Sequence, residues 1–290
     1  MYWITTDINS KNTLKFCLTS GNFSMVMSLT NKEKYKKFKP LKFLGQNFLV
    51  DDNIAAKIAG SLDISPDDYV VEIGAGYGAL TKHILKLTKN YTAVEIDRKC
   101  VETLHEKFGD INIIEKDFLL TNPEEFPGRI KIIGNIPYNI TSKILFKIFS
   151  FGGSVSGVVI MVQKEYAARM TSQPRTKDYG IISVQTQFFS KPKYLFSVPP
   201  TAFFPKPDVT SAIVRMDFPG KLTSGIKNIP LFQEFVRESF SQRRKTLKNS
   251  LNGFFQKYKI DPAIAKFDFS VRAETLTPAE FTALFTSLKL

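Results

Sequence analysis

Short apolar segments alternate with amphipathic segments through the middle of this 290-residue chain, and this alternation restricts the possible folds most. The pattern predicts strands at 69–73, 91–96, 111–115, 130–133 and 158–162, and helices at 53–62, 80–87, 98–108 and 142–149. Further strands are expected near 182–188 and 212–216. Alternating strands and helices usually form a parallel sheet with helices on both faces. The expected fold class is therefore α/β and Rossmann-like.

The pattern changes after about Pro219. Residues 232–240 and 245–255 have helical periodicity, and Thr277-Pro278-Ala279-Glu280 has the form of a capping box that begins a last helix toward Leu288. Before residue 32 the chain is rich in Ser, Thr and Asn and has no clear period. We expect a disordered tail over 1–31, an α/β domain over 32–219 and a small helical domain over 220–290.

The chain is basic, with 40 Lys and Arg residues against 27 Asp and Glu residues and a formal net charge of +13. Such an excess, with many aromatic residues beside it, favours nucleic acid as the partner. The sequence contains no run of about 18 apolar residues, so no membrane span is expected. Cys17 and Cys100 lie far apart, and with His83 and His105 they offer almost no metal ligands. We expect a cytoplasmic protein with no disulfide and no metal site.

A glycine-rich turn, Gly74-Ala75-Gly76-Tyr77-Gly78-Ala79-Leu80, follows the first predicted strand. Glycines permit a tight turn and let a ligand approach the backbone. Glu95 ends the next strand, where a carboxylate can accept hydrogen bonds from both hydroxyls of a ribose. The turn alone leaves two cofactors open. Gly74, Gly76 and Ala79 fit the dinucleotide pattern G-x-G-x-x-G/A, whereas Glu72, Gly74, Gly76 and Gly78 resemble the S-adenosylmethionine turn of class I methyltransferases.

Polar residues also follow the third and fourth predicted strands. Asp117 can accept a hydrogen bond from an adenine amine, although a turn cap is the alternative interpretation. The fourth strand ends in Gly134-Asn135-Ile136-Pro137-Tyr138. The side-chain oxygen of Asn135 and the backbone carbonyl of Ile136 can accept both N–H bonds of an adenine N6 amine, which favours a more nucleophilic, tetrahedral nitrogen. Pro137 would hold the loop, and Tyr138 would stack on the base. Positioning and polar groups, rather than a strong general base, would supply most of the rate.

Four ordered motifs together resemble one family. Asn135 to Tyr138 fits N-[I/L/P]-P-[Y/F] of amine methyltransferases, and its surroundings resemble the ribosomal RNA small-subunit adenine dimethyltransferases. The other three motifs are Lys42-Phe43-Leu44-Gly45-Gln46-Asn47-Phe48-Leu49, Val198-Pro199-Pro200-Thr201-Ala202-Phe203-Phe204-Pro205-Lys206-Pro207-Asp208-Val209-Thr210-Ser211, and Phe240-Ser241-Gln242-Arg243-Arg244-Lys245-Thr246-Leu247. The resemblance extends from about Phe38 to Leu288.

The resemblance implies a class I methyltransferase sheet over 32–219 that binds S-adenosylmethionine, followed by an RNA-binding helical domain. It implies that the cofactor contacts are Asn47, Leu49, Gly74, Gly76, Glu95, Asp117 and Asn135. Asn135 would also bind the target amine, and Tyr138 and Phe203 would enclose a flipped adenine. The implied substrate is two adjacent adenosines near the 3′ end of small-subunit ribosomal RNA, within a pre-mature small ribosomal subunit. We expect the enzyme to act as a monomer.

The helical domain adds a cluster of positive charge. Between Arg215 and Lys259 there are ten basic and three acidic residues. Arg243, Arg244 and Lys245 are expected to open a helix that contains Lys248, and these four residues are the predicted RNA contacts. Arg and Lys there would position phosphates rather than read bases.

Three alternatives remain open. An erythromycin-resistance type of enzyme would methylate large-subunit RNA with a similar sheet, although the Arg243-to-Leu247 motif disfavours it. The chain could instead be an assembly or transcription factor that keeps the fold without catalysing a reaction. The intact Asn135 and Tyr138 disfavour this alternative. A nicotinamide oxidoreductase would need a hydride-site acid or base, and the sequence offers no obvious one.

Overall fold

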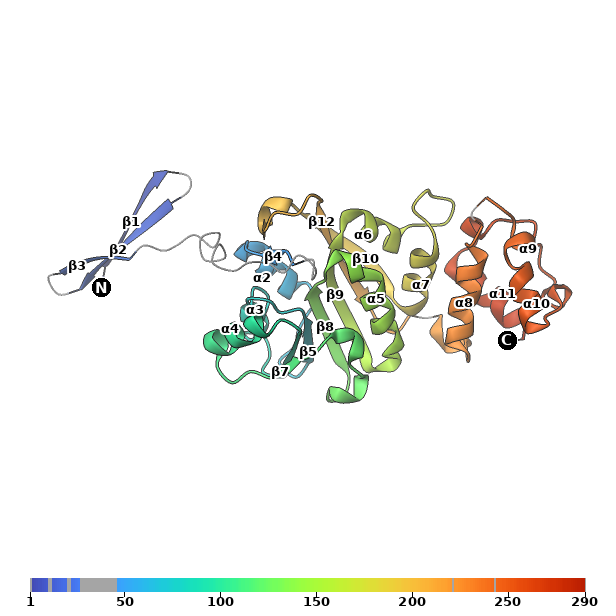
Figure 1. The fold of residues 1–290 in the computed structure, drawn as a ribbon, viewed down its shortest axis with the longest axis horizontal. Coiled ribbons are helices and arrows are strands. Elements are labelled where there is room, and N and C mark those ends of the chain that lie inside the picture. The colour runs from blue at the N-terminus through green and yellow to red at the C-terminus, as the bar shows by residue number, and fades with distance from the viewer. Residues whose placement is uncertain are drawn as a thin grey trace.

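The central element of the structure, a computed structural model, is a seven-stranded sheet (Figure 1). The structure describes residues 2–9, 12–19, 22–26, 46–220, 222–242 and 244–289. Arg243 lies outside these ranges. The strands are β5 (Tyr69–Ile73), β6 (Tyr91–Glu95), β7 (Ile113–Glu115), β8 (Ile130–Asn135), β9 (Val155–Gln163), β10 (Lys191–Val198) and β12 (Ser211–Asp217). Their order is β10-β12-β9-β8-β5-β6-β7.

The sheet is mixed rather than wholly parallel. Strands β9, β8, β5, β6 and β7 pair in parallel, whereas β12 is antiparallel to both β9 and β10. The helix-connected strands therefore all end at one edge of the sheet, because parallel strands have their carboxyl ends on the same side. This edge is where the polar residues of the sequence motifs meet.

Alternate residues of the strands point to opposite faces, and each face has its own apolar core. One core joins Val70, Ala93, Ile133 and Val159 to helices α2 (Asp52–Gly60), α3 (Thr81–Ile84) and α4 (Arg98–Phe108). The other joins the intervening strand residues, such as Val71 and Ile132, to α5 (Thr141–Ser150), α6 (Lys164–Thr171) and α7 (Ile181–Phe189). The predicted α/β class with helices on both faces is confirmed.

Residues 182–188, predicted to be a strand, lie within helix α7, so that prediction is wrong. Short apolar runs do not distinguish a buried strand from a buried helix. Helix α7 is covered by the sheet and by the carboxyl-terminal helices, and its residues from Ile182 to Thr186 are all buried. The outermost strand at this end of the sheet is β10 instead.

The carboxyl-terminal part is helical, as predicted. It contains α8 (Ile229–Ser239), α9 (Leu247–Ser250), α10 (Asn252–Tyr258) and α11 (Pro278–Ser287). Thr277 caps α11, and Glu280 completes the capping box as expected. The aromatic rings of α8 and α11 continue the core around α7, since Phe232 lies 4.3 Å from Phe188, centroid to centroid. The proposed domain boundary near residue 219 falls between β12 and α8.

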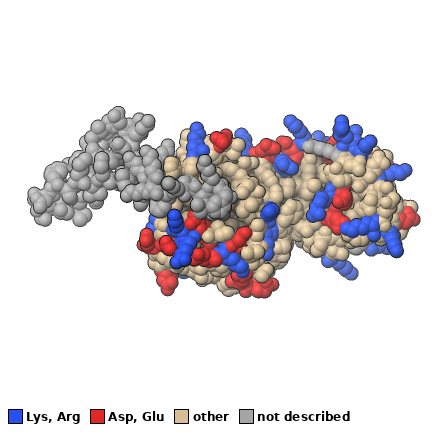
Figure 2. Space-filling model, in the orientation of Figure 1, with Lys and Arg blue, Asp and Glu red and all other residues tan. Residues whose placement is uncertain are grey.

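Arg244 and Lys245 do not open a helix, contrary to the prediction from the sequence. Thr246 has an extended backbone, and α9 begins only at Leu247. Arg244 and Lys245 therefore lie in the turn before α9, whereas Lys248 lies on it; all three side chains are exposed. Figure 2 shows Lys and Arg over much of the visible surface of this helical part.

At the amino-terminal end, β1 (Tyr2–Asn9), β2 (Asn12–Thr19) and β3 (Asn22–Val26) form an antiparallel sheet. These strands lie within the range 1–31, for which the sequence predicts a disordered tail. Two residues separate each strand from the next, which is the spacing of a β-hairpin.

Among the residues described, none of the helices combines the length and hydropathy needed to cross a membrane.

Candidate active site

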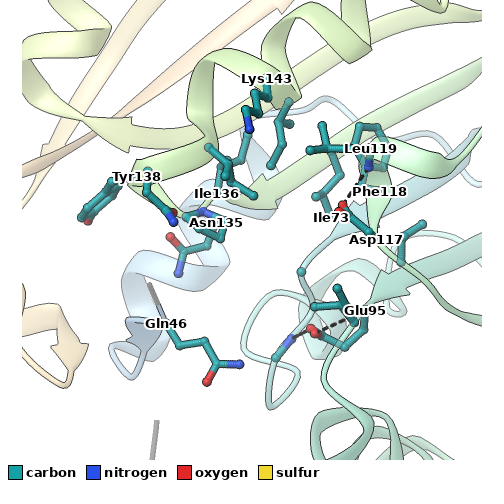
Figure 3. A pocket seen from close by; sticks show the side chains of 18 of the residues that line it. Gln46, Ile73, Glu95, Asp117, Phe118, Leu119, Asn135, Ile136, Tyr138 and Lys143 are labelled. Carbon is teal, nitrogen blue, oxygen red and sulfur yellow. Dashed lines mark hydrogen bonds between the residues drawn. The ribbon is translucent and has the colours of Figure 1, made fainter. Parts of the chain in front are cut away.

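A cavity of about 330 Å³ opens at the carboxyl ends of β5, β6, β7 and β8. Its wall contains Gly74 and Gly76 after β5, Glu95 at the end of β6, Asp117 after β7, and Asn135 at the end of β8. Asn47 and Tyr138 also line it. The structure thus brings together residues separated by up to 91 positions in sequence. Figure 3 shows Glu95, Asp117 and Asn135 around this space.

The glycine turn takes a shape that other residues adopt only with strain. Gly74 and Gly76 have φ angles of +67° and +54°, in the left-handed region. At Gly76 a Cβ atom would lie 3.2 Å from the ring of Phe48 as well. The turn therefore needs glycine both for its backbone conformation and for the close approach of the segment that contains Phe48.

Glu95 is held in place by backbone donors. Its Oε2 accepts from Gly76 N–H at 2.8 Å, and its Oε1 accepts from Ile96 N–H and Asp97 N–H at 2.8 and 2.9 Å. Burial raises the pKa of this carboxyl, and the three backbone donors oppose that rise. The donors fix the carboxylate geometry, and the remaining lone pair of Oε2 can accept a hydrogen bond from a ligand in the cavity.

Asp117 caps a turn and also lines the cavity, so the cap does not exclude contact with a ligand. Its Oδ1 accepts from Leu119 N–H at 2.9 Å and caps the short 3-10 turn Phe118–Leu120. The residue also lines the cavity, beside Phe118 and Leu119. Since Oδ1 satisfies the turn, Oδ2 can accept from an amine without breaking the cap.

Asn135 is oriented by the segment 46–48, which lines the cavity. Its Nδ2 donates to the backbone carbonyl of Asn47 at 2.8 Å. No described residue donates to its Oδ1, so this oxygen can serve as the acceptor that the proposed chemistry requires. Gln46, on the same segment, donates to Asp97 Oδ2 at 2.9 Å and joins the segment to the β6 side of the cavity.

Tyr138 lines the cavity, and its hydroxyl is 2.5 Å from Ser211 Oγ. This bond to β12 holds the ring beside Asn135, where it can stack on a planar group. Tyr138 is half-buried, so part of its ring is available for that contact.

Two predicted site residues do not line this cavity. Phe203 is 1% exposed, and Leu49 is 3% exposed. They pair backbone to backbone in a short ladder between β4 (Phe48–Leu49) and β11 (Phe203–Phe204), and their side chains belong to one apolar cluster. Phe203 is therefore buried in this structure, and its role as a second stacking face for the base stays a prediction. Leu49 borders a separate chamber of about 30 Å³ next to Glu72.

Several lining residues were missed by the sequence analysis. Ile96 stands out because it is 52% exposed although it is large and apolar. With Phe118 and Leu119 it forms an apolar wall near Asp117. Its position directly after the strand-ending acid could have identified it. Gln46 belongs to the motif that begins at Lys42, but its position in the sequence indicated no role for it.

Comparisons with known proteins agree with this geometry. Residues 37–290 match the family model described as ribosomal RNA adenine dimethylase. The chain is 42% identical to ribosomal RNA small subunit methyltransferase A of Prosthecochloris aestuarii, over 88% of this chain and 97% of that protein. It is 40% identical to the protein of the same name from Francisella tularensis, over 86% of this chain and 97% of that protein.

Two solved structures have similar folds. A dimethyladenosine transferase from Plasmodium falciparum is 26% identical, with a TM-score of 0.70 over 82% of this chain and 96% of that one. The 23S rRNA methyltransferase ErmE is also 26% identical, with a TM-score of 0.63 over 84% of this chain and 100% of that one. Both similarities extend over most of the described residues.

Proposed function

The chain belongs to the ribosomal RNA adenine dimethylase family of S-adenosylmethionine-dependent methyltransferases, and we propose that it methylates the N6 amines of two adjacent adenosines near the 3′ end of small-subunit ribosomal RNA. The product would be dimethyladenosine in both positions. The single observation that supports this most is the oriented amide of Asn135 beside Tyr138 in the cavity.

The cavity fits the nucleoside part of the cofactor. Ribose hydroxyls and an adenine amine are hydrogen-bond donors, and Glu95 and Asp117 place carboxylate acceptors at the ends of neighbouring strands. The partly exposed side chain of Ile96 supplies an apolar surface for a planar base. We assign Glu95 to the ribose and Asp117 to the adenine. When bound, the cofactor supplies an electrophilic methyl group on sulfonium sulfur.

The chain's own residues would prepare the target amine. Asn135 Oδ1 and the Ile136 carbonyl accept its two N–H bonds, which reduces the delocalisation of the nitrogen lone pair into the ring. Tyr138 stacks on the base and holds it. The Asn47 carbonyl fixes the direction of the Asn135 amide, so the acceptor is already in place before the base arrives. The methylated ammonium is acidic enough to release its proton afterwards.

We propose that the helical part binds the RNA backbone. Arg244, Lys245 and Lys248 are exposed, and their charges suit phosphates. Arg243 is included in this proposal on its sequence position alone. We propose that the enzyme acts as a monomer. We place the reaction in the cytoplasm, on the pre-mature small ribosomal subunit.

The test uses purified protein, methyl-labelled cofactor and small subunits from a strain that lacks these methyl groups. We expect dimethyladenosine in the small-subunit RNA, located by mass spectrometry. Asn135→Ala should reduce the rate at least about 100-fold through loss of one oriented acceptor, while RNA affinity stays within a few-fold. Absence of dimethyladenosine, with an active control enzyme, would contradict the proposal. Methylation of large-subunit RNA instead would favour the activity named for ErmE.

A further inference from the structure

Lys143 is a cation in the cavity wall that the proposed chemistry does not use. It lines the cavity together with Asn139, Ile140 and Ile144. Its side chain is exposed, and it forms no ion pair or hydrogen bond with any described residue. The other lysine of the wall, Lys116, is paired with Glu125 at 3.0 Å. Among the lysines that line this cavity, Lys143 is therefore the one whose charge is uncompensated.

The surroundings of Lys143 strengthen its positive potential. It lies on the first turn of α5, five residues after Tyr138. That turn contains no acidic residue, and the amino-terminal end of a helix itself bears partial positive charge. In Figure 3, Lys143 lies on the side of Ile136 and Leu119, away from Glu95 and Gln46. Lys143 therefore places a positive charge on the part of the cavity wall that lies away from Glu95.

The carboxylates of the cavity wall and Lys143 suit different ligands. Glu95 and Asp117 suit the hydroxyl and amine donors of the cofactor, whereas a lysine would only repel a sulfonium cation. A target adenosine, by contrast, brings phosphates. Its base must leave the stack to reach Asn135, while its charged backbone stays outside an apolar cavity. The long, exposed side chain of Lys143 can reach a phosphate at the mouth of the cavity.

We propose that Lys143 is a positioning residue that binds a phosphate next to the flipped adenosine. This inference rests on the proposed function and extends it to the backbone of the target strand. The contact would fix the distance between the backbone and the base, so that Tyr138 and Asn135 receive the base in one register. It differs from the contacts of Arg244, Lys245 and Lys248, which lie in the helical part.

The experiment compares Lys143→Gln and Lys143→Arg with the wild type on small-subunit RNA. Lys147→Gln is the matched control, since Lys147 lies one turn further along α5, faces the Phe151 ring at 5.8 Å and does not line the cavity. For Lys143→Gln we expect the KM for RNA to rise about five- to tenfold, because one charge-assisted contact is lost. The slope of log affinity against log salt should become shallower by about 0.7, the value for one phosphate on a single strand.

Three further results are expected. Lys143→Arg should restore the KM to within about twofold, Lys147→Gln should resemble the wild type, and the Kd for S-adenosylhomocysteine should not change. An unchanged KM in Lys143→Gln, an equal effect in Lys147→Gln, or a change confined to the cofactor Kd would each overturn the proposal. If the wild type methylates no RNA, the proposed function fails. RNA binding by the same variants at several salt concentrations then still decides the role of Lys143.

Discussion

The carboxyl of Glu72, at the start of the glycine turn, should make the stability of this protein depend on pH. Glu72 is 1% exposed, and its Oε2 accepts from the Tyr91 hydroxyl at 2.6 Å and from Thr81 Oγ1 at 2.7 Å. Burial raises its pKa from the ordinary value of 4.5 to about 7, although the two hydroxyl donors oppose this rise. The nearby Glu95 charge contributes to this rise in the pKa of Glu72.

The sign of the effect follows from the direction of this shift. The folded state holds the proton more tightly than the unfolded state, so the contribution of Glu72 is fully present below pH 4.5 and is lost as the pH rises through about 7. Each unit of pKa difference corresponds to about 1.4 kcal/mol. Between pH 5 and pH 8, ionisation of Glu72 should therefore lower the free energy of unfolding by about 2.5 kcal/mol.

Urea unfolding of the wild type and of Glu72→Gln, at several pH values from 5 to 8, measures this contribution. Glutamine keeps an oxygen that can accept from Tyr91 and Thr81, and it does not ionise. The stability of the wild type relative to Glu72→Gln should fall by about 2.5 kcal/mol over this range. Subtracting the two proteins removes groups that titrate in both, including most of the contribution of Glu95. A difference that stays constant with pH would refute the reasoning.

Substitutions of two further residues, Tyr138 and Gln185, test the site and the core. Tyr138→Phe keeps the ring and loses only the bond to Ser211, so kcat/KM for RNA should stay within about fivefold, whereas Tyr138→Ala should lower it about 10- to 100-fold through lost stacking. Steady-state kinetics measure both, and equal losses in the two variants would disprove a stacking role. Gln185 is fully buried, and neither its Nε2 nor its Oε1 has a partner among the described residues. Gln185→Met should therefore raise the free energy of unfolding by about 1 kcal/mol. Urea titration measures this change, and a less stable variant would show that the amide is satisfied in solution.

The sequence by itself determined which residues gather at the cavity. Gly74, Glu95, Asp117 and Asn135 each follow or end a strand whose apolar run is visible locally, and parallel strands bring their carboxyl ends to one edge. The periodicity therefore located β5 and α4 to the residue, and it predicted that these four residues meet at one site. Local periodicity predicts such strands and helices correctly because it depends only on residues within each segment.

Only the tertiary structure decided how distant segments constrain these side chains. The orientation of Asn135 depends on a carbonyl 88 residues away, and the burial of Phe203 depends on its pairing with Leu49. Helix α7 has the composition of a buried strand, and only its position between the sheet and the carboxyl-terminal helices explains that composition. The uncompensated charge of Lys143 likewise depends on which carboxylates are within reach. Contacts of this kind join residues far apart in the chain, so the local periodicity of the sequence does not predict them.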